Sequence, residues 1–184
     1  MFPATDERIR KLLPFEVLSR LAKQSKVIVN AGSCLWDLSE GCVAKGAVDE
    51  SYAQEYIEGI QRLHRVLMDI IPGVTIYWRT CPPISQPYDM DRAKSGWGRT
   101  RSNQAILNNL LKRTVSEYNL GKVVDWWTQF SGVPEETITE SMGDRTVHYR
   151  KEPTLAFFNM WLNTVFNDDP SLRVLPGVED NEMA

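Results

Sequence analysis

Apolar side chains recur at helical spacing in four segments of the chain, and each segment predicts helix. The four ranges are 6–24, 49–71, 102–118 and 152–166. Pro14 interrupts the first range, so two short helices are expected there. In the last range one apolar face is expected to point inward, and it consists of Leu155, Phe158, Trp161, Leu162 and Val165. The tail beyond Asn167 is expected to be frayed.

Three short runs of β-branched and aromatic residues lie between these helices and predict strands. They span 26–30, 74–79 and 122–126. Strands that alternate with helices are typical of a parallel sheet with right-handed crossovers, so we predict a three-layer α/β/α fold. Ligands bind such sheets beyond the carboxyl ends of the strands. Residues 30–37, 79–83 and the loop after Trp126 are therefore the expected site.

The composition is that of a globular protein and excludes several classes of function. Of 184 residues, 42% are hydrophobic and 24% charged, so neither a disordered chain nor a fibre is expected. This length predicts a single domain over 1–166 with a tail at 167–184. The net charge is -3 and no basic block is long, so nucleic acid is not an expected partner. No apolar run approaches the roughly 20 residues that cross a bilayer.

The amino-terminal residues and the cysteines indicate the compartment. The chain begins with a polar, acidic segment rather than the basic start and apolar run of a secretory signal. Its three cysteines, Cys34, Cys42 and Cys81, are odd in number and are not arranged as C-x-x-C. We therefore predict reduced thiols and a cytoplasmic protein.

Only two histidines are available for acid–base chemistry. His64 lies on or beside the apolar stripe of 49–71 and is interpreted as structural. His148 lies in a glycine-led loop before the last helix, at the edge where a ligand is expected. There Asp144 could accept the Nδ1 proton and leave Nε2 free to take a proton from a nucleophile. An ordinary surface loop with an incidental aspartate is the alternative.

The turn after the first predicted strand is a candidate oxyanion hole. Asn30 and Gly32 precede Ser33 there, and backbone amides with an amide side chain can stabilise a developing oxyanion. The alternative is a tight strand-to-helix turn that packs Trp36. Both interpretations stay open on the residues alone.

Three blocks taken together resemble the SGNH/GDSL hydrolase superfamily, most closely its PC-esterase-like branch. The first block is Asn-x-Gly followed by Leu-Trp-Asp-Leu, over residues 30–38. The second is Ile-Tyr-Trp-Arg-Thr-Cys-Pro-Pro, residues 76–83, and the third joins Asp144 to Val147-His148-Tyr149. The resemblance spans residues 20–166 and depends on the order and spacing of all three blocks.

The resemblance implies both a fold and a chemistry. Members have a five-stranded parallel flavodoxin-like sheet and a serine nucleophile in an amino-terminal Gly-Asp-Ser block. They hydrolyse esters or transfer acyl groups without a metal or cofactor, so a small-molecule or glycan ester is the implied substrate. His148 and Asp144 would be catalytic, and Asn30 and Gly32 would line the oxyanion hole.

The sequence departs from the family pattern at several positions. It contains no Gly-Asp-Ser triplet, since its only Gly-Asp dipeptide is followed by Arg145, and its Asp and His have one extra residue between them. Trp36 stands where many members carry an oxyanion-hole asparagine, and Asn30 is the expected substitute. The family's first two strands have no counterpart, so we expect an amino-terminally shortened domain. Strand 26–30 would then be an exposed apolar edge, open to a partner.

A second hypothesis follows from the missing nucleophile block. The chain would be an inactive SGNH-like remnant that binds a ligand or protein in the same cleft. Arg79, Trp97 and Arg99 could hold an acidic or sugar-like ligand there, although solvated loop residues are the commoner case.

Three other side chains are candidate nucleophiles. A thiol of Cys34 or Cys81 could pair with His148, although a buried cysteine is usually just a small apolar residue. Ser33 follows a strand in a glycine turn but lacks the G-x-S-x-G pattern of a nucleophile elbow.

Overall fold

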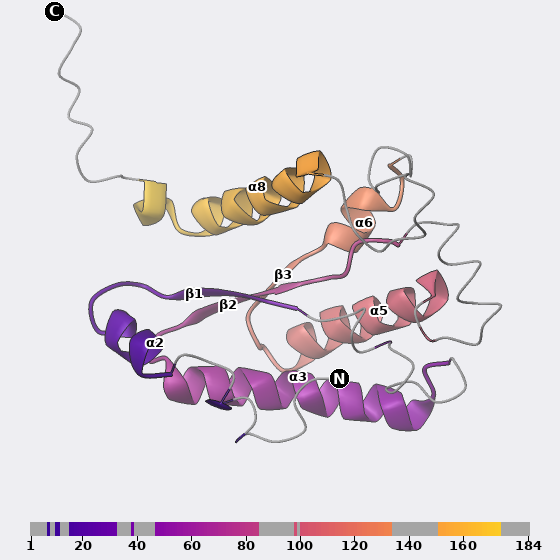
Figure 1. Cartoon of the computed structure of the whole chain (residues 1–184), viewed down its shortest axis with the longest axis horizontal. Coiled ribbons are helices and arrows are strands. Elements are labelled where there is room, and N and C mark those ends of the chain that lie inside the picture. The colour runs from indigo at the N-terminus through magenta and orange to yellow at the C-terminus, as the bar shows by residue number, and fades with distance from the viewer. Residues whose placement is uncertain are drawn as a thin grey trace, which may run out of the picture.

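A computed structural model describes residues 7, 10–11, 15–32, 38, 47–84, 98, 100–133 and 151–173. Three parallel strands form one sheet in the order β1-β2-β3 (Figure 1). The strands are β1 (Ile28–Ala31), β2 (Thr75–Arg79) and β3 (Lys122–Val124). The helices are α2 (Phe15–Ala22), α3 (Glu50–Ile70), α5 (Arg101–Glu117), α6 (Trp126–Phe130), α8 (Lys151–Asp168) and the 3₁₀ helix η2 (Pro170–Arg173). The predicted α/β class is confirmed.

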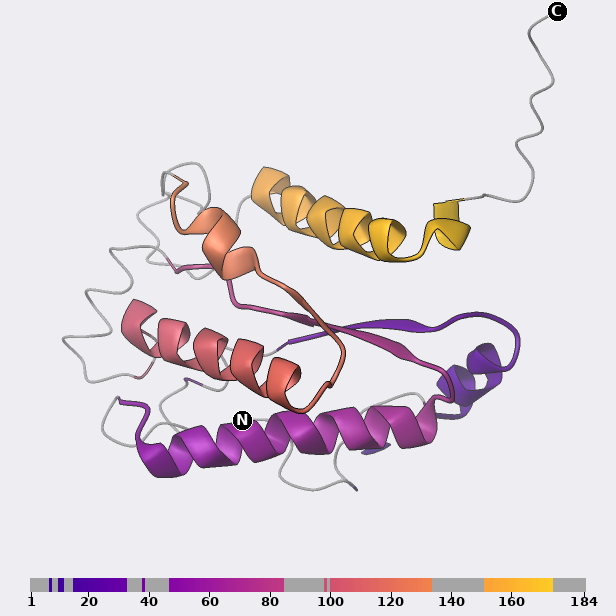
Figure 2. The same cartoon turned by 180° about the vertical axis from the view of Figure 1, so that it is seen from behind.

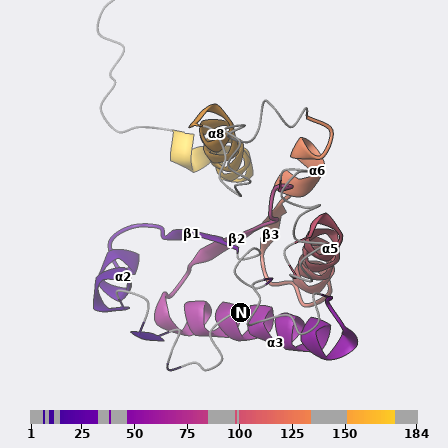
Figure 3. The same cartoon turned by 45° about the vertical axis from the view of Figure 1, so that its right-hand side comes forward.

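Helices cover both faces of the sheet (Figures 1 and 3). The helices α3 and α5 pack against each other under one face, and α8 lies over the other. The β1–α3–β2 and β2–α5–β3 crossovers both move the chain in the same direction across the sheet. Because such crossovers are right-handed, both helices lie on the same face. This is the layout of the last three strands of a flavodoxin-like sheet of order 2-1-3-4-5. No helix in the described ranges is long and apolar enough to cross a membrane.

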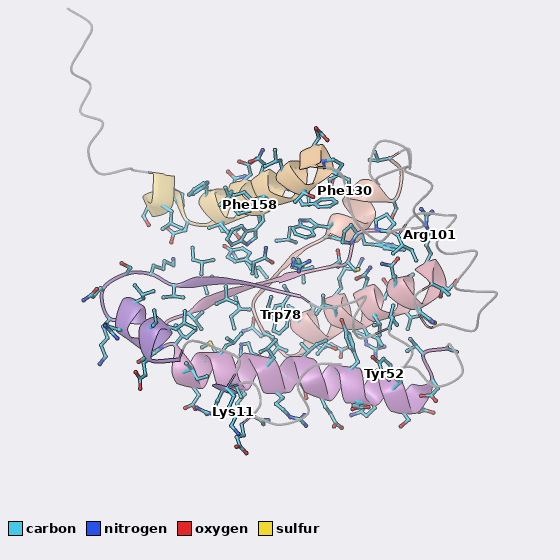
Figure 4. The ribbon with its side chains drawn as sticks, viewed as in Figure 1. Lys11, Tyr52, Trp78, Arg101, Phe130 and Phe158 are labelled. Atoms are coloured by element: carbon cyan, nitrogen blue, oxygen red, sulfur yellow. The ribbon has the colours of Figure 1, made fainter. Side chains whose placement is uncertain are left out.

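The central strand β2 divides the core into two layers, because successive side chains of a strand point to opposite faces. Ile76 and Trp78 join the cluster under α3 and α5, while Tyr77 joins the smaller cluster under α8. Trp78 is completely buried, and its indole Nε1 donates a hydrogen bond of 2.9 Å to the carbonyl of Leu120 (Figure 4). One side chain of β2 therefore holds the turn that leads into β3.

That turn also needs a left-handed backbone. Asn119 has a φ of 52° and Gly121 a φ of 123°, a region that glycine adopts without strain. A Cβ on Gly121 would lie 2.4 Å from the carbonyl oxygen of Ile76. The close approach of β3 to β2 thus requires glycine at this position on two independent grounds.

The carboxy-terminal end of α8 is tied to the sheet by polar contacts. Tyr77 Oη donates to Asp168 Oδ2 at 2.9 Å, and Lys122 Nζ lies 2.9 Å from Asp168 Oδ1. Burial, followed by the hydrogen bond to Asp168, raises the pKa of Tyr77 to about 12. Lys26 forms an ion pair with Asp169, the residue after the helix. Both lysines come from the sheet or the segment that enters it.

The inward face predicted for the last helix is wrong in its first half and holds for Trp161 and Val165 in its second half. Leu155 and Phe158 are each 50% exposed, whereas Phe157 is only 4% exposed. Phe157 takes the inward position because it packs between Trp126 and Phe130, at ring-centroid distances of 4.9 and 4.3 Å. Aromatic residues of α6, an element that the periodicity did not predict, therefore set the rotation of α8. Val165 is buried as expected.

Two boundaries also differ from expectation. The third strand ends at Val124 rather than Trp126, because Asp125 caps a helix that starts at Trp126. Residues 168–173 of the tail that was expected to fray are ordered, since α8 continues to Asp168 and η2 follows, whereas 174–184 lie outside the described residues. Partial helix in the first predicted range is seen as α2, while most of its first piece lies outside the described residues.

Replacing Gly121 by alanine tests the turn before β3. We expect Gly121→Ala to lower the free energy of unfolding by at least about 2 kcal/mol, because it adds a backbone clash to a strained φ. Gly132→Ala is the matched control, since a Cβ there meets nothing within 4 Å. Chemical denaturation of both variants gives the comparison, and equal stabilities would contradict the role of Gly121.

Candidate functional site

All three strands end at one edge of the sheet, because they are parallel. The residues at this edge are Asn30–Gly32 after β1, Arg79–Ile84 after β2 and Asp125 after β3. The start of α8 and the whole of α6 lie at the same end of the molecule (Figures 1 and 2). This carboxyl edge is where a ligand of an α/β sheet is expected.

Arg79, the last residue of β2, is held across the end of β1. A Cβ on Gly32 would lie 2.6 Å from Arg79 Cγ and 2.8 Å from the Arg79 carbonyl oxygen. The Arg79 side chain therefore crosses over Gly32, and any residue with a Cβ at position 32 would collide with it. Its guanidinium carbon lies 4.9 Å from the ring centroid of Trp126, in cation–π geometry.

Unpaired polar groups gather on the α8 face of this edge. Within the described residues, Asn30 Oδ1 and Trp126 Nε1 are buried without a hydrogen-bond partner. Asn30 is paired with Tyr77 in the sheet register, so both point toward α8, as does Arg79 two residues further on. Buried polar groups are nearly always hydrogen-bonded, so these atoms mark a place where a partner is needed.

Asp125 organises the opposite, α5 face of the edge. Its Oδ1 accepts from Thr80 Oγ1 at 3.0 Å and from the backbone of Thr128 at 3.1 Å, which caps α6. Its Oδ2 lies 3.0 Å from Lys112 Nζ and accepts from Thr128 Oγ1 at 2.7 Å. The backbone N–H of Trp127 donates to Thr80 Oγ1 at 2.8 Å. The end of β2 is thus joined to the start of α6.

Burial acts to raise the pKa of Asp125, but the hydrogen bonds from Thr128, Lys112 and Thr80 outweigh it. The pKa therefore lies below its ordinary value of 3.8. Asp125 is fully engaged as a carboxylate and has a structural role at this edge.

Polar side chains of α5 hold the chain that leaves β2. Asn108 accepts from the backbone N–H of Cys81 at 2.8 Å and donates to its carbonyl at 3.0 Å. Gln104 does the same for two neighbouring groups, accepting from the N–H of Ile84 at 3.1 Å and donating to the Pro82 carbonyl at 3.2 Å. Arg101 donates to the Ile84 carbonyl at 2.8 Å (Figure 4). This clamp was not predicted from the sequence, although polar residues at helical spacing along α5 indicate a polar inner face.

The structure places some of the residues that the sequence singled out. Asn30 and Gly32 lie at the carboxyl edge, as expected, whereas Asp144 and His148 lie outside the described residues. So do Ser33, Cys34, Trp36, Cys42, Trp97, Arg99 and Arg145.

Two other candidates lie within the described ranges. Cys81 is a buried free thiol whose Sγ lies 3.1 Å from Gln104 Nε2. His64 is half-buried on α3, and burial lowers its pKa. Among the described residues no group of three or more His, Cys, Asp or Glu side chains could hold a metal ion.

Comparison with known proteins supports the fold and goes no further. No family model matches the chain, and no curated protein matches it. A solved crystal structure is similar with a TM-score of 0.52, at 16% sequence identity, over 83% of this chain and 70% of that chain. At that identity the likeness shows a shared fold alone.

The pH dependence of stability tests the role of Asp125. Because its folded pKa is lowered, its contribution is present above the unfolded value of 3.8 and is lost as the pH falls through the folded value. Asp125→Asn should therefore lower the unfolding free energy by about 1 kcal/mol or less at pH 7, and the difference should shrink at acid pH.

Denaturant unfolding of both proteins between pH 7 and pH 3 gives the two curves. Glu58→Gln replaces an exposed carboxylate of α3 and should change stability little at either end. A constant difference between Asp125→Asn and the native protein over this pH range would contradict the assignment.

Proposed function

We propose that this chain belongs to an SGNH-type serine esterase or acyl hydrolase of the PC-esterase-like branch, acting on small-molecule or glycan esters. The observation that supports it is that the described parts of two sequence blocks, Asn30–Gly32 and Arg79–Pro83, lie at one edge of the sheet although they are far apart in the chain. The first block begins at the end of β1, and the second runs along β2 and past its end. The third ends at Tyr149, two residues before α8 begins at Lys151. The described residues of the first two blocks share the carboxyl edge, and the third block precedes in sequence a helix that starts at the same end of the molecule (Figure 1).

The arrangement of the sheet is compatible with this family. A flavodoxin-like sheet of order 2-1-3-4-5 ends in three sequential neighbours, with two crossover helices on one face and the last helix on the other. The strands β1, β2 and β3 with α3, α5 and α8 follow that order. In the proposal β1 corresponds to the third family strand.

Each residue of the proposed mechanism has one role. A serine attacks the ester carbonyl while His148 takes its proton, and Asp144 orients the imidazole and stabilises its charged form. Asn30 Nδ2 and the backbone N–H of Gly32 donate hydrogen bonds to the oxyanion that forms. His148 then gives the proton to the leaving alcohol, and water releases the acyl group by the same steps.

The nucleophile is the part of this mechanism that the sequence does not contain, because no Gly-Asp-Ser triplet occurs in it. That fact favours a second candidate, in which the chain is a non-catalytic module that binds a ligand or protein at the same edge. The two candidates share a binding site and differ in turnover. A direct assay therefore separates them.

Replacing each of the two histidines by alanine in turn tests the esterase proposal. In protein expressed from its complete natural coding sequence, His148→Ala should reduce hydrolysis of 4-nitrophenyl acetate by about 10⁴-fold, because the general base is lost. His64→Ala is the matched control and should leave the rate unchanged, since His64 lies on α3 away from the edge.

The outcomes separate the candidates. Activity that survives His148→Ala, or disappears with His64→Ala, would overturn the residue assignment. Intact mass together with fluorophosphonate labelling shows whether a reactive serine is present and where it lies. Saturable ligand binding without hydrolysis or labelling would replace the esterase by the binding module.

A further inference from the structure

Arg79 is restrained more tightly than an ordinary arginine at a strand end. Its backbone is paired with Val124 of β3, its stem crosses Gly32, and its guanidinium lies over the Trp126 ring. Trp126 is itself stacked on Phe157 of α8 at a centroid distance of 4.9 Å. The positive charge therefore lies at the carboxyl edge over the ring of Trp126, which Phe157 of α8 supports.

Asp125, the acidic residue that follows β3, is engaged elsewhere. Both oxygens of Asp125 accept hydrogen bonds from Thr80, Lys112 and Thr128, on the face that points toward α5. Within the described residues Arg79 forms no ion pair. A guanidinium whose carbon lies over an indole ring keeps its N–H groups, which can match a carboxylate or phosphate with two parallel hydrogen bonds.

Two further groups beside Arg79 need partners. Asn30 Oδ1 is an acceptor and Trp126 Nε1 is a donor, and both are buried without one among the described residues. A ligand with an oxyanion and a hydroxyl group can supply what all three groups need.

We propose that Arg79 binds the oxyanion of an anionic ligand, with Trp126 as its stacking platform and Asn30 as an acceptor for a ligand hydroxyl. The substrate class is then an ester that carries a carboxylate or phosphate group in addition to the bond that is cleaved. This substrate assignment rests on the proposed function, whereas the binding of the anion does not.

Titration of the full chain with three sugars tests the binding directly. Glucuronate carries a carboxylate, glucose 6-phosphate carries a phosphate, and glucose carries neither. Calorimetry should show saturable binding of at least one anion and at least about tenfold weaker binding of glucose, because charge-assisted hydrogen bonds to arginine are strong. The stronger of the two anions identifies the group, and its affinity should fall as salt is added.

Variants assign the binding to Arg79. Arg79→Gln should weaken the preferred anion by about tenfold or more, and Arg79→Lys should weaken it too, since lysine keeps the charge but loses the fork and the stacking. Arg113→Gln is the matched control, because Arg113 is exposed on α5 and lies 3.7 Å from Glu117. It should leave the affinity unchanged.

Gly32→Ala tests the positioning of Arg79 without changing its charge. It should weaken binding of the anion and leave binding of neutral glucose unchanged, because the added Cβ displaces the aliphatic part of the Arg79 side chain. Circular dichroism of each variant shows that it is folded, and Arg79→Lys serves if Arg79→Gln is not.

Three results would overturn the proposal: equal binding of glucose and the anions, no binding of either anion at millimolar concentration, or unchanged affinity in Arg79→Gln and Arg79→Lys. If only the esterase proposal is wrong, the protein will bind the anion in a way that depends on Arg79 but will hydrolyse no ester. Hydrolysis that depends on His148 but shows no preference for anionic esters would instead contradict the proposed anionic substrate and support the esterase.

Discussion

The pairing of β2 with a parallel strand on each of its edges is the constraint on which the other contacts depend. The register aligns Trp78 with Ala31 on one side and Val123 on the other, so these three side chains share one face. Tyr77 aligns with Asn30 and Lys122 on the opposite face. A slip of β3 by one residue would exchange its two faces and bury Lys122 where Val123 now packs against the core.

The same alternation gives the carboxyl edge two independent polar arrangements. Arg79 and Thr80 are neighbours in the chain but point to opposite faces. Arg79 reaches Trp126 on the α8 side, while Thr80 bonds Asp125 and Trp127 on the α5 side. The first residues after β3 are therefore held from both faces. An edge held in this way keeps its polar groups in place without help from a ligand, as binding sites require.

Periodicity predicted the long elements of this fold closely. The helix expected at 49–71 spans Glu50–Ile70, and the strand expected at 74–79 spans Thr75–Arg79. These segments combine a strong apolar pattern with clear end signals, so local and tertiary preferences agree. The helix α6 was not predicted because five residues are too few to show a period, and its start depends on a cap whose other partner is Thr80.

The candidate site was predictable only in its location. Asn30 and Gly32 were expected at the carboxyl edge because strand ends can be read from the pattern, and they lie there. The contact between Arg79 and Trp126 joins residues from two strand ends, and only the register brings them together. The hydrogen bonds between Asn108 and the backbone of Cys81 could not be predicted for the same reason. The spacing along the helix indicates that the Asn108 amide is buried, but it does not indicate which backbone groups the amide binds. Asp144 and His148 remain predictions.

The far end of α8 shows how the last helix depends on the rest of the molecule. The helix has no basic residue in its last turn and ends in Asp168 followed by Asp169, where the helix dipole disfavours negative charge. Lys122 and Lys26 supply the opposing charge, but they come from the sheet region rather than from the helix. An isolated α8 peptide would therefore unwind from this end. The charge that stabilises the last turn of α8 thus comes from the sheet region and is absent from the helix's own sequence.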